Sequence, residues 1–216
     1  MIEQTQGIVL RVIRYSESSL IVHWLTEDAG RIATMAKGAL RPKSEFRGKL
    51  DLFHHCQLTY QRSHRSTLHN LREISLTRVF EGLSRDMDKV TQATYVAQLV
   101  SKSTEEDTPA DGMFELLEHF LETLNKAKDS ELLHILNFEF ILLRLLGLEP
   151  QWRNDRLSME SKQTFDVWAG ADPNALNFPP GKLSKIRLEI FKYLGRFMTY
   201  HLGLPPKLRA ELWNLD

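Results

Sequence analysis

The spacing of apolar residues changes once along this chain, after Val79, and this change limits the folds open to it. Before Val79, short runs rich in β-branched side chains alternate with turn residues, as in the strands of a sheet. These runs lie at residues 5–13, 20–26, 31–36, 50–60 and 67–76. After Val79 the apolar residues recur about every 3.6 positions, which is the period of an amphipathic helix. The pattern predicts an α+β protein whose strands precede its helices.

Five short strands within about 75 residues suit a small closed or nearly closed barrel. An OB-fold is the natural candidate because it has five strands and often binds nucleic acid. An SH3-like barrel has a similar sequence pattern and stays open as an alternative. The predicted domains are an OB-fold domain at residues 1–80 and a helical domain at 81–216, with an irregular segment near 149–182 that is rich in proline and glycine.

Two helices of the second part have clear sequence signals. Thr108 and Pro109 predict a helix start, with threonine as the N-cap and proline in the first helical position. A second helix is predicted from about Ser130 to Leu146, ending at Gly147. It is apolar on most sides, so we expect it at the centre of a helical bundle.

Composition favours a soluble intracellular protein. The chain has 216 residues and a single cysteine, Cys56, so it forms no internal disulfide and no cysteine-rich zinc site. Its first residues lack a basic segment followed by a long apolar run, so we expect no signal peptide. The most apolar stretch, residues 138–148, is too short to span a bilayer. We expect a cytoplasmic protein that does not enter a membrane.

The zero net charge of the whole chain hides an uneven distribution. Residues 1–80 hold twelve cations and seven anions, a net charge of +5. Residues 81–150 have a net charge of −8, and residues 151–216 have +3. A basic first segment favours a polyanionic partner for the predicted barrel.

The cations concentrate in residues 37–49, called the basic loop below. Five lysines and arginines lie there against one acid, and Gly38, Pro42 and Gly48 break any regular element. Cations on a loop can bind phosphates through release of condensed counterions. Phe46 lies among them and could stack on bases, or it could pack back onto the barrel. A solvated loop without a specific role is the plainer alternative.

Signals for catalysis are weak in this sequence. It has neither a phosphate-binding glycine loop nor a nucleophile elbow, so no nucleotide cofactor is expected. His54, His55 and Cys56 are adjacent, but a strand would turn them to opposite faces, which argues against a metal site. The acids at 105–107 and at 115–122 fit a loop and a solvated helix face. We therefore expect a protein that is not an enzyme and uses no cofactor or metal.

Several short segments form an ordered set along the chain. In the first part they are Gly7-Ile-Val-Leu-Arg, Tyr15-Ser-Glu-Ser-Ser-Leu, Leu25-Thr-Glu-Asp-Ala-Gly, Lys37-Gly-Ala and Leu52-Phe. The later ones are Thr94-Tyr-Val-Ala-Gln-Leu and Asn137-Phe-Glu-Phe-Ile-Leu-Leu-Arg-Leu-Leu-Gly-Leu. Taken in order, these segments resemble the RecO family of bacterial recombination mediators. The resemblance is strong over residues 7–53 and returns faintly near Lys207 to Arg209.

The resemblance implies an OB-fold followed by a helical domain, acting in the bacterial cytoplasm and at the nucleoid during DNA repair. Such proteins bind single- and double-stranded DNA, anneal complementary strands, and engage SSB and RecR so that RecA can load. The family likeness assigns phosphate contacts to Lys37, Arg41, Lys43 and Lys49. The charge argument adds Arg31, Arg47, Arg65 and Arg72, with Phe46 as the aromatic member.

The resemblance also implies a pocket for the acidic, phenylalanine-ended SSB C-terminal tail. Its predicted rim is Lys207 and Arg209, and its predicted apolar walls are Ile135, Phe138 and Leu142. The chain departs from the family pattern in two respects. It lacks the four later cysteines that hold zinc in many relatives, and Leu208 replaces the serine of the closing motif.

Two functions of other classes remain open. One is a protein-interaction adaptor whose barrel does not bind nucleic acid and whose helical domain is the active surface. The other is a hydrolase that uses the carboxylates of residues 105–122. Binding of the SSB tail or RecR that survives neutralisation of the basic loop would favour the adaptor. Metal- or pH-dependent turnover that Glu→Gln changes in residues 105–122 abolish would favour the hydrolase.

Overall fold

The chain divides into two compact units in the computed structural model, which describes residues 1–128, 132–170, 183–203 and 205–213. The barrel unit consists of residues 1–81 and 100–114. The helical unit consists of residues 82–99 and 115–216. The sequence predicts one boundary at residue 80, whereas the structure groups the later segment 100–114 with the strands.

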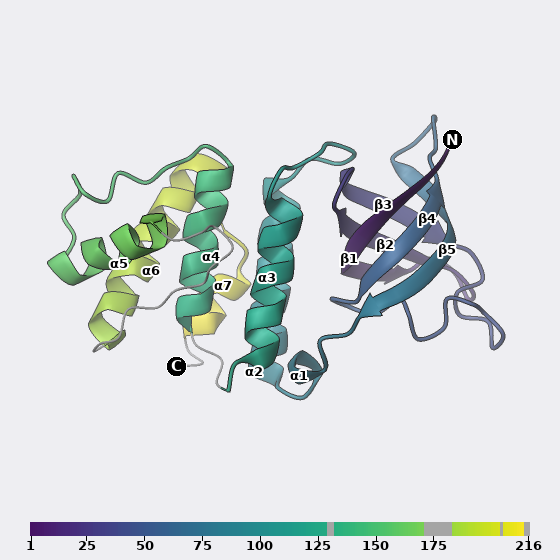
Figure 1. Cartoon of the computed structure of the whole chain (residues 1–216), viewed down its shortest axis with the longest axis horizontal. Coiled ribbons are helices and arrows are strands. Elements are labelled where there is room, and N and C mark those ends of the chain that lie inside the picture. Colours follow the sequence, from purple (N-terminus) through teal and green to yellow (C-terminus); the bar gives the residue numbers. More distant parts are fainter. Residues whose placement is uncertain (129–131, 171–182, 204, 214–216) are drawn as a thin grey trace. The chain divides into compact units, whose positions relative to one another are not determined.

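Five strands close into a barrel in the order β1-β2-β3-β5-β4 (Figure 1). They are β1 (Ile2–Arg14), β2 (Leu20–Thr26), β3 (Gly30–Ala36), β4 (His55–Gln61) and β5 (Leu68–Arg78). All neighbouring pairs are antiparallel except β3 and β5, which run parallel. The predicted fold class is thereby confirmed as a five-stranded OB-type barrel followed by helices.

Two strand boundaries differ from the predicted ones. β1 begins at Ile2 because its first residues pair with the end of β4, from Gln57 to Gln61. The predicted strand 50–60 begins only at His55. The residues before it form turns, and Phe53 adopts a left-handed backbone with φ of 64°. This conformation is incompatible with a regular strand.

Alternating side chains of the strands fill the barrel. The interior includes Trp24, whose indole nitrogen donates a 2.8 Å hydrogen bond to the Thr34 hydroxyl. Gly7 lies beside the Trp24 ring, and a larger residue would not fit at this position because its Cβ would come within 2.8 Å of Leu58 Cδ2. The remaining buried members of the cluster are Val9, Val22, Ile32, Ala36, Ala39, Cys56, Tyr60, Leu71 and Ile74.

The remaining elements are helices. They are α1 (Glu81–Ser84), α2 (Met87–Ser103), α3 (Met113–Lys126), α4 (Leu132–Leu145), α5 (Met159–Gly170), α6 (Leu183–Leu202) and α7 (Leu208–Leu212). α4 is buried from Leu132 to Leu143, as its apolar character on all sides predicts. No helix within the described residues is long and apolar enough to cross a membrane.

The predicted helix start at Thr108 is wrong, because α3 begins at Met113. The Thr108 hydroxyl donates to the Glu106 carbonyl rather than capping a helix. The Thr108 carbonyl also occupies the space above Gly30, where a Cβ would lie 1.8 Å from its oxygen. Residues 104–109, called the acidic segment below, therefore serve as a connection packed on the barrel.

A buried ion pair joins the C-terminal helix to the centre of the helical unit. Arg209 on α7 donates to both carboxylate oxygens of Glu139 on α4, at 2.7 and 2.8 Å. The Tyr95 hydroxyl donates to the same carboxylate, whose side chain is fully buried. Burial and the nearby Glu139 charge raise the pKa of Tyr95. Because the carboxylate has three donors, its burial is compensated.

Candidate nucleic-acid interface

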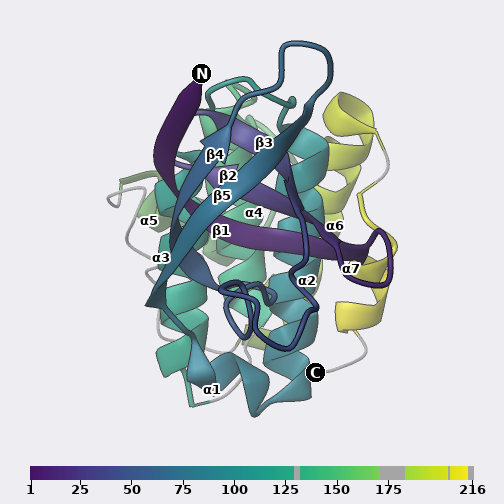
Figure 2. The same ribbon diagram turned by 90° about the vertical axis from the view of Figure 1, so that its right-hand side faces the viewer.

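The basic loop is a succession of tight turns between β3 and β4. Backbone hydrogen bonds link residues three apart, from Arg41 N to Gly38 O, Ser44 N to Arg41 O and Arg47 N to Ser44 O. Gly38 and Gly48 adopt a left-handed backbone conformation, with φ of 70° and 72°, and this conformation favours glycine. In Figure 2 this dark-blue loop lies below β1.

Apolar and polar anchors hold the basic loop to the barrel. Ala39 is buried in the barrel core, and Phe46 and Leu50 pack against that core. The Lys49 ammonium donates a 3.1 Å hydrogen bond to the Ile74 carbonyl on β5. Of the two alternatives for Phe46, the structure shows the packed one, with the ring partly buried against the barrel core. Lys49 likewise has part of its donor capacity occupied.

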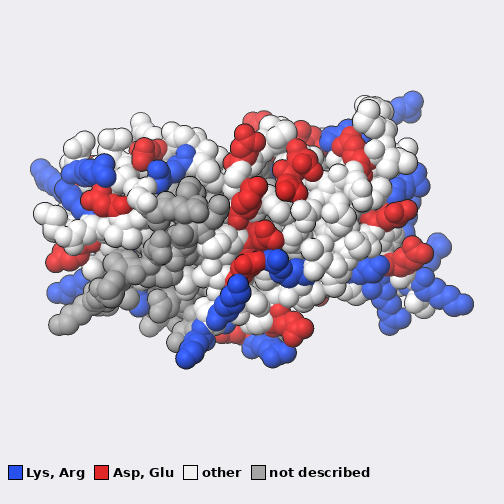
Figure 3. Space-filling view, viewed as in Figure 1, with Lys and Arg blue, Asp and Glu red and all other residues white. Residues whose placement is uncertain are grey.

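Four predicted contacts remain on the surface of the loop. Lys37, Arg41, Lys43 and Arg47 are exposed. The Arg47 side chain donates one bond to the Pro42 carbonyl, and the side chains of the other three have no hydrogen bond or ion pair within the described residues. Figure 3 shows lysine and arginine side chains gathered at the end of the barrel from which the loop extends. This group is available to bind phosphate.

Arg72 lies near the loop, whereas Arg65 does not. β3 and β5 run parallel, with Met35 opposite Asn70. Extending this register by two residues places Arg72 opposite Lys37, at the start of the basic loop. Its guanidinium donates to the Gln61 amide oxygen. Arg65 is exposed in the β4–β5 connection, which lies at the opposite end of the barrel from the basic loop in Figures 1 and 2. The structure therefore separates Arg65 from the other predicted contacts.

Arg31 is engaged by the acidic segment and is not an open phosphate contact. Its side chain is only 17% exposed and forms a 3.0 Å ion pair with Glu106. It also donates to the Thr104 carbonyl at 3.1 Å. Its place in the predicted DNA-binding set is corrected for this reason. The partner comes from 75 positions along the chain, and no local pattern around Arg31 reveals it.

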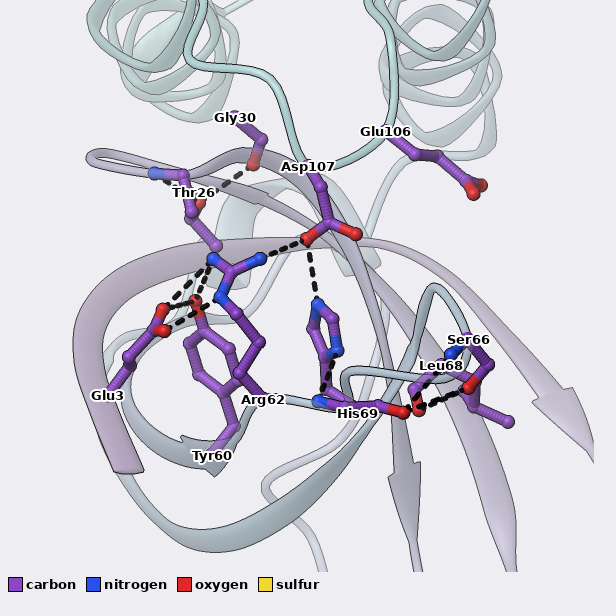
Figure 4. A network of polar contacts seen from close by, with 12 residues as sticks. Glu3, Thr26, Gly30, Tyr60, Arg62, Ser66, Leu68, His69, Glu106 and Asp107 are labelled. Carbon is purple, nitrogen blue, oxygen red and sulfur yellow. Dashed lines mark hydrogen bonds and ion pairs between the residues drawn. The ribbon is translucent and has the colours of Figure 1, made fainter. Parts of the chain in front are cut away.

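A polar network fastens the acidic segment to the barrel (Figure 4). Asp107 accepts hydrogen bonds of 2.7 Å from both Arg62 and His69. His69 Nδ1 accepts from the Ser63 amide, so Nε2 carries the proton that faces Asp107. Glu3 completes the network by accepting from Arg62 and Tyr60. Hydrogen bonding from Arg62 lowers the pKa of Glu3 to about 2.

These contacts give the acids a structural explanation. Glu106 and Asp107 each neutralise an arginine of the barrel. The acids of α3, namely Glu115, Glu118 and Glu122, lie on the helix over which Figure 3 shows a column of acidic side chains. The hydrolase alternative needs carboxylates held together in a cleft, and these two groups instead form ion pairs or a polar helix face.

The His54-His55-Cys56 run is also accounted for by ordinary packing. His54 Nδ1 faces the Lys49 carbonyl at 3.0 Å, and His55 Nε2 faces the Gln6 amide oxygen at 3.0 Å. Burial raises the pKa of the Cys56 thiol to about 12. Over the described parts of the chain, no group of three or more His, Cys, Asp or Glu side chains is placed to hold a metal ion.

The predicted tail pocket on the helical unit is corrected by the burial of its walls. Ile135, Phe138 and Leu142 are at most 1% exposed, so they belong to the core of the unit. Arg209 is held by Glu139, and Lys207 is exposed just before α7. The five residues therefore do not form one open pocket.

A hollow of about 610 Å³ lies on the helical unit against α6, and of the five predicted pocket residues Arg209 lines it. Its lining includes Lys192, Arg196, Tyr200 and Arg209, together with Phe191, Gly195 and Thr199. Among the described residues, no carboxylate lines it. Lys192 and Arg196 are exposed and have no ion pair within the described residues. The sequence interpretation missed these two because α6 shows only an ordinary amphipathic pattern.

Sequence reasoning also left Arg11 and Arg14 out of the basic surface. Both are exposed on β1, and Arg14 lies at its end beside the β1–β2 turn. That turn is bonded to the basic loop, since Leu40 N donates to the Ser18 carbonyl at 3.0 Å. The excess of cations over residues 1–80 was the available signal, but it does not identify which ones share a face.

Fold and site together define a class of protein: an OB-type barrel that carries a turn-built basic loop and continues into a helical unit. Family comparison makes the assignment more specific. Residues 1–80 match the family described as Recombination protein O N terminal, and residues 84–184 match Recombination protein O C terminal. The chain belongs to this RecO family.

Individual relatives agree with the family models. The chain is 36% identical over 144 residues to DNA repair protein RecO of Rhodopirellula baltica, covering 67% of this chain and 53% of the relative. It is 31% identical over 151 residues to DNA repair protein RecO of Bacillus subtilis, covering 70% and 58%. The matched part thus spans somewhat more than half the length of these curated relatives.

Proposed function

We propose that this protein binds DNA through the basic loop and acts as a mediator of recombinational DNA repair. The proposal is supported by one observation above all: Lys37, Arg41, Lys43 and Arg47 are exposed together on a loop anchored to an OB-type barrel. Since phosphates are common to all DNA, such a site would bind single and double strands alike. Family membership and the names of the relatives support the repair role.

Annealing of complementary strands follows from the same chemistry. Cations that neutralise phosphates reduce the repulsion between two strands and let their bases pair. This step breaks no covalent bond and consumes no nucleotide. The proposal accordingly assigns no catalytic residue and no cofactor, and it places the protein in the bacterial cytoplasm, at the nucleoid during repair.

The test is fluorescence-anisotropy binding of a labelled single-stranded oligonucleotide over a salt series. The variant Lys37→Ala/Arg41→Ala/Lys43→Ala removes three exposed cations of the basic loop. We expect weaker binding and a log–log salt slope flatter by about 2, since each lost phosphate contact removes about 0.7. An unchanged slope would place the DNA on another face.

The matched control removes the same charge elsewhere. Lys126→Ala/Lys128→Ala/Arg156→Ala takes three exposed cations from the helical unit. We expect this control to keep the wild-type slope. If both triple variants weaken binding equally, the effect comes from net charge and the basic loop is not the site. If the wild-type protein does not bind at low salt, the mediator role fails and the adaptor alternative gains.

A second proposed activity, SSB engagement, is favoured by the hollow against α6. Its cations and its aromatic rings Phe191 and Tyr200 suit an acidic peptide that ends in an apolar side chain. We expect Lys192→Ala/Arg196→Ala to weaken binding of an SSB-tail peptide about tenfold and to leave DNA affinity within twofold. Substitution of Arg209 is a poor test because it would leave the buried Glu139 carboxylate without its cation. RecR engagement and help in RecA loading are included in the proposal on the family resemblance alone.

A further inference from the structure

The aromatic residues of the barrel unit differ sharply in exposure. All residues of this unit are described. Its members Trp24, Phe53, Tyr60, Phe80 and Phe114 are at most 6% exposed, and Phe46 packs against the core. Tyr15 is 64% exposed, and its hydroxyl has no hydrogen-bond partner within the unit. Among the phenylalanine, tryptophan and tyrosine side chains of the barrel unit, Tyr15 is the most exposed.

Tyr15 stands on a well-defined turn between β1 and β2. Its amide donates to the Ser19 carbonyl at 3.0 Å, and the Ser16 hydroxyl accepts from the amides of Ser18 and Ser19. The Arg14 guanidinium donates to the Ser16 carbonyl at 3.3 Å. A ring carried on a turn with this many internal bonds loses little backbone freedom when a base stacks on it.

The same turn is joined to the basic loop. Leu40 N donates to the Ser18 carbonyl at 3.0 Å, and Gly38 N donates to the Ser19 hydroxyl at 3.3 Å. Strand register shows the same proximity. Arg14 on β1 pairs with Leu20 on β2, and Leu20 pairs with Ala36 on β3. Tyr15 and Lys37 come one residue after Arg14 and Ala36, so they lie at the same level across the three strands. Two strand spacings separate them, a backbone distance of about 10 Å.

From this arrangement we propose that Tyr15 is a base-stacking residue and gives the basic surface a preference for single-stranded DNA. The inference rests on the proposed DNA-binding function and adds a specificity determinant to it. Cations of the loop bind phosphates of either DNA form. An unpaired base can also stack on the tyrosine ring, whereas a duplex base cannot do so without leaving its own stack. Stacking needs no particular base, so the preference is independent of sequence.

The experiment compares Tyr15→Ala with Tyr15→Phe, each titrated with a labelled oligothymidine and with a labelled mixed-sequence duplex. We expect Tyr15→Ala to weaken single-strand binding about tenfold and duplex binding less than twofold. Tyr15→Phe keeps the ring and should stay within twofold of wild type on both. The salt slope should not change in either variant, because no phosphate contact is removed.

The possible failures are distinguishable. Equal loss on single strand and duplex, or unchanged single-strand binding in Tyr15→Ala with the basic-loop triple variant still defective, would overturn the stacking role and leave the proposed function standing. A wild-type protein that binds neither DNA would overturn both. Thermal unfolding of Tyr15→Ala should match wild type because the side chain is exposed, and a lowered midpoint would point to a structural role instead.

Discussion

Two charged loops of the barrel unit use their charges in opposite ways. The basic loop, residues 37–49, keeps most of its cations exposed and without ionic partners among the residues that the structure describes. The acidic segment, residues 104–109, uses Glu106 and Asp107 to neutralise Arg31 and Arg62 of the barrel. Both segments have the composition of a solvated loop. Charge density along a sequence therefore does not show whether charges are free for a partner or already paired within the fold.

The largest expected effect comes from breaking the acidic segment's attachment. Asp107→Ala removes the acceptor shared by Arg62 and the buried His69, which is 1% exposed. We expect the free energy of unfolding to fall by about 3 kcal/mol, because a buried imidazole N–H then has no acceptor. Urea denaturation followed by fluorescence measures it.

The neighbouring Glu105 provides the matched control. It is exposed and makes no hydrogen bond or ion pair within the described residues. Glu105→Ala should change the free energy of unfolding by less than about 0.5 kcal/mol. Equal destabilisation by the two variants would show that the segment contributes through its general charge and not through the Asp107 contacts.

Phe46 tests the corresponding attachment of the basic loop. Phe46→Ala should cost about 2 kcal/mol of unfolding free energy, roughly half the value for a fully buried phenylalanine, because its ring is only partly buried against the barrel core. Phe46→Leu preserves most of that packing and should cost about 1 kcal/mol. Urea denaturation measures the unfolding free energy of both variants, and anisotropy titration measures their affinity for single-stranded DNA.

The leucine variant separates anchoring from stacking. If Phe46 is an anchor, Phe46→Leu should bind DNA within twofold of wild type, since the loop stays attached. A tenfold loss of single-strand affinity in a stable Phe46→Leu protein would mean that the ring contacts bases after all. That result would also weaken the assignment of stacking to Tyr15.

Glu3 makes the polar network of the acidic segment dependent on pH. Its pKa is lowered from 4.5 to about 2 by hydrogen bonding from Arg62. A lowered pKa stabilises the folded state above pH 4.5, and this contribution is lost as the pH falls from there to about 2. Because the side chain is partly solvated, we expect only about 1 kcal/mol.

The measurement is the difference in unfolding free energy between wild type and Glu3→Gln at pH 7, 4 and 3. We expect the difference to be about 1 kcal/mol at pH 7 and to shrink at the lower values. Glu17→Gln, which removes an exposed carboxylate without such partners, should show a small difference at every pH. A Glu3→Gln difference that does not vary with pH would mean the carboxylate charge is not what stabilises the network.

The sequence predicted the fold better than the site because the two depend on different ranges of the chain. Strand alternation and the apolar character of α4 are local patterns, and both predict the observed elements. The partner of Arg31 lies 75 positions away, and the partners of Glu3 lie 57 and 59 positions away. Those pairings exist only after the barrel closes. For the same reason the sequence pattern cannot distinguish pocket walls from core at the buried Ile135 and Phe138, since apolar side chains occur in both.

The smallest expected effect is a change in DNA affinity, and it comes from a comparison of two arginines at opposite ends of the barrel. Arg41 and Arg65 are both exposed arginines of the barrel unit, so Arg41→Ala and Arg65→Ala change the net charge equally. Long-range attraction of DNA therefore weakens by a similar amount in both, and any difference reports local phosphate contact. We expect Arg41→Ala to weaken single-strand binding about fivefold and to flatten the salt slope by about 0.7, and Arg65→Ala to stay within twofold. Equal losses in anisotropy titrations would mean that the DNA path runs from one end of the barrel to the other. The contrast between an open basic loop and a paired acidic segment would then describe only part of a longer interface.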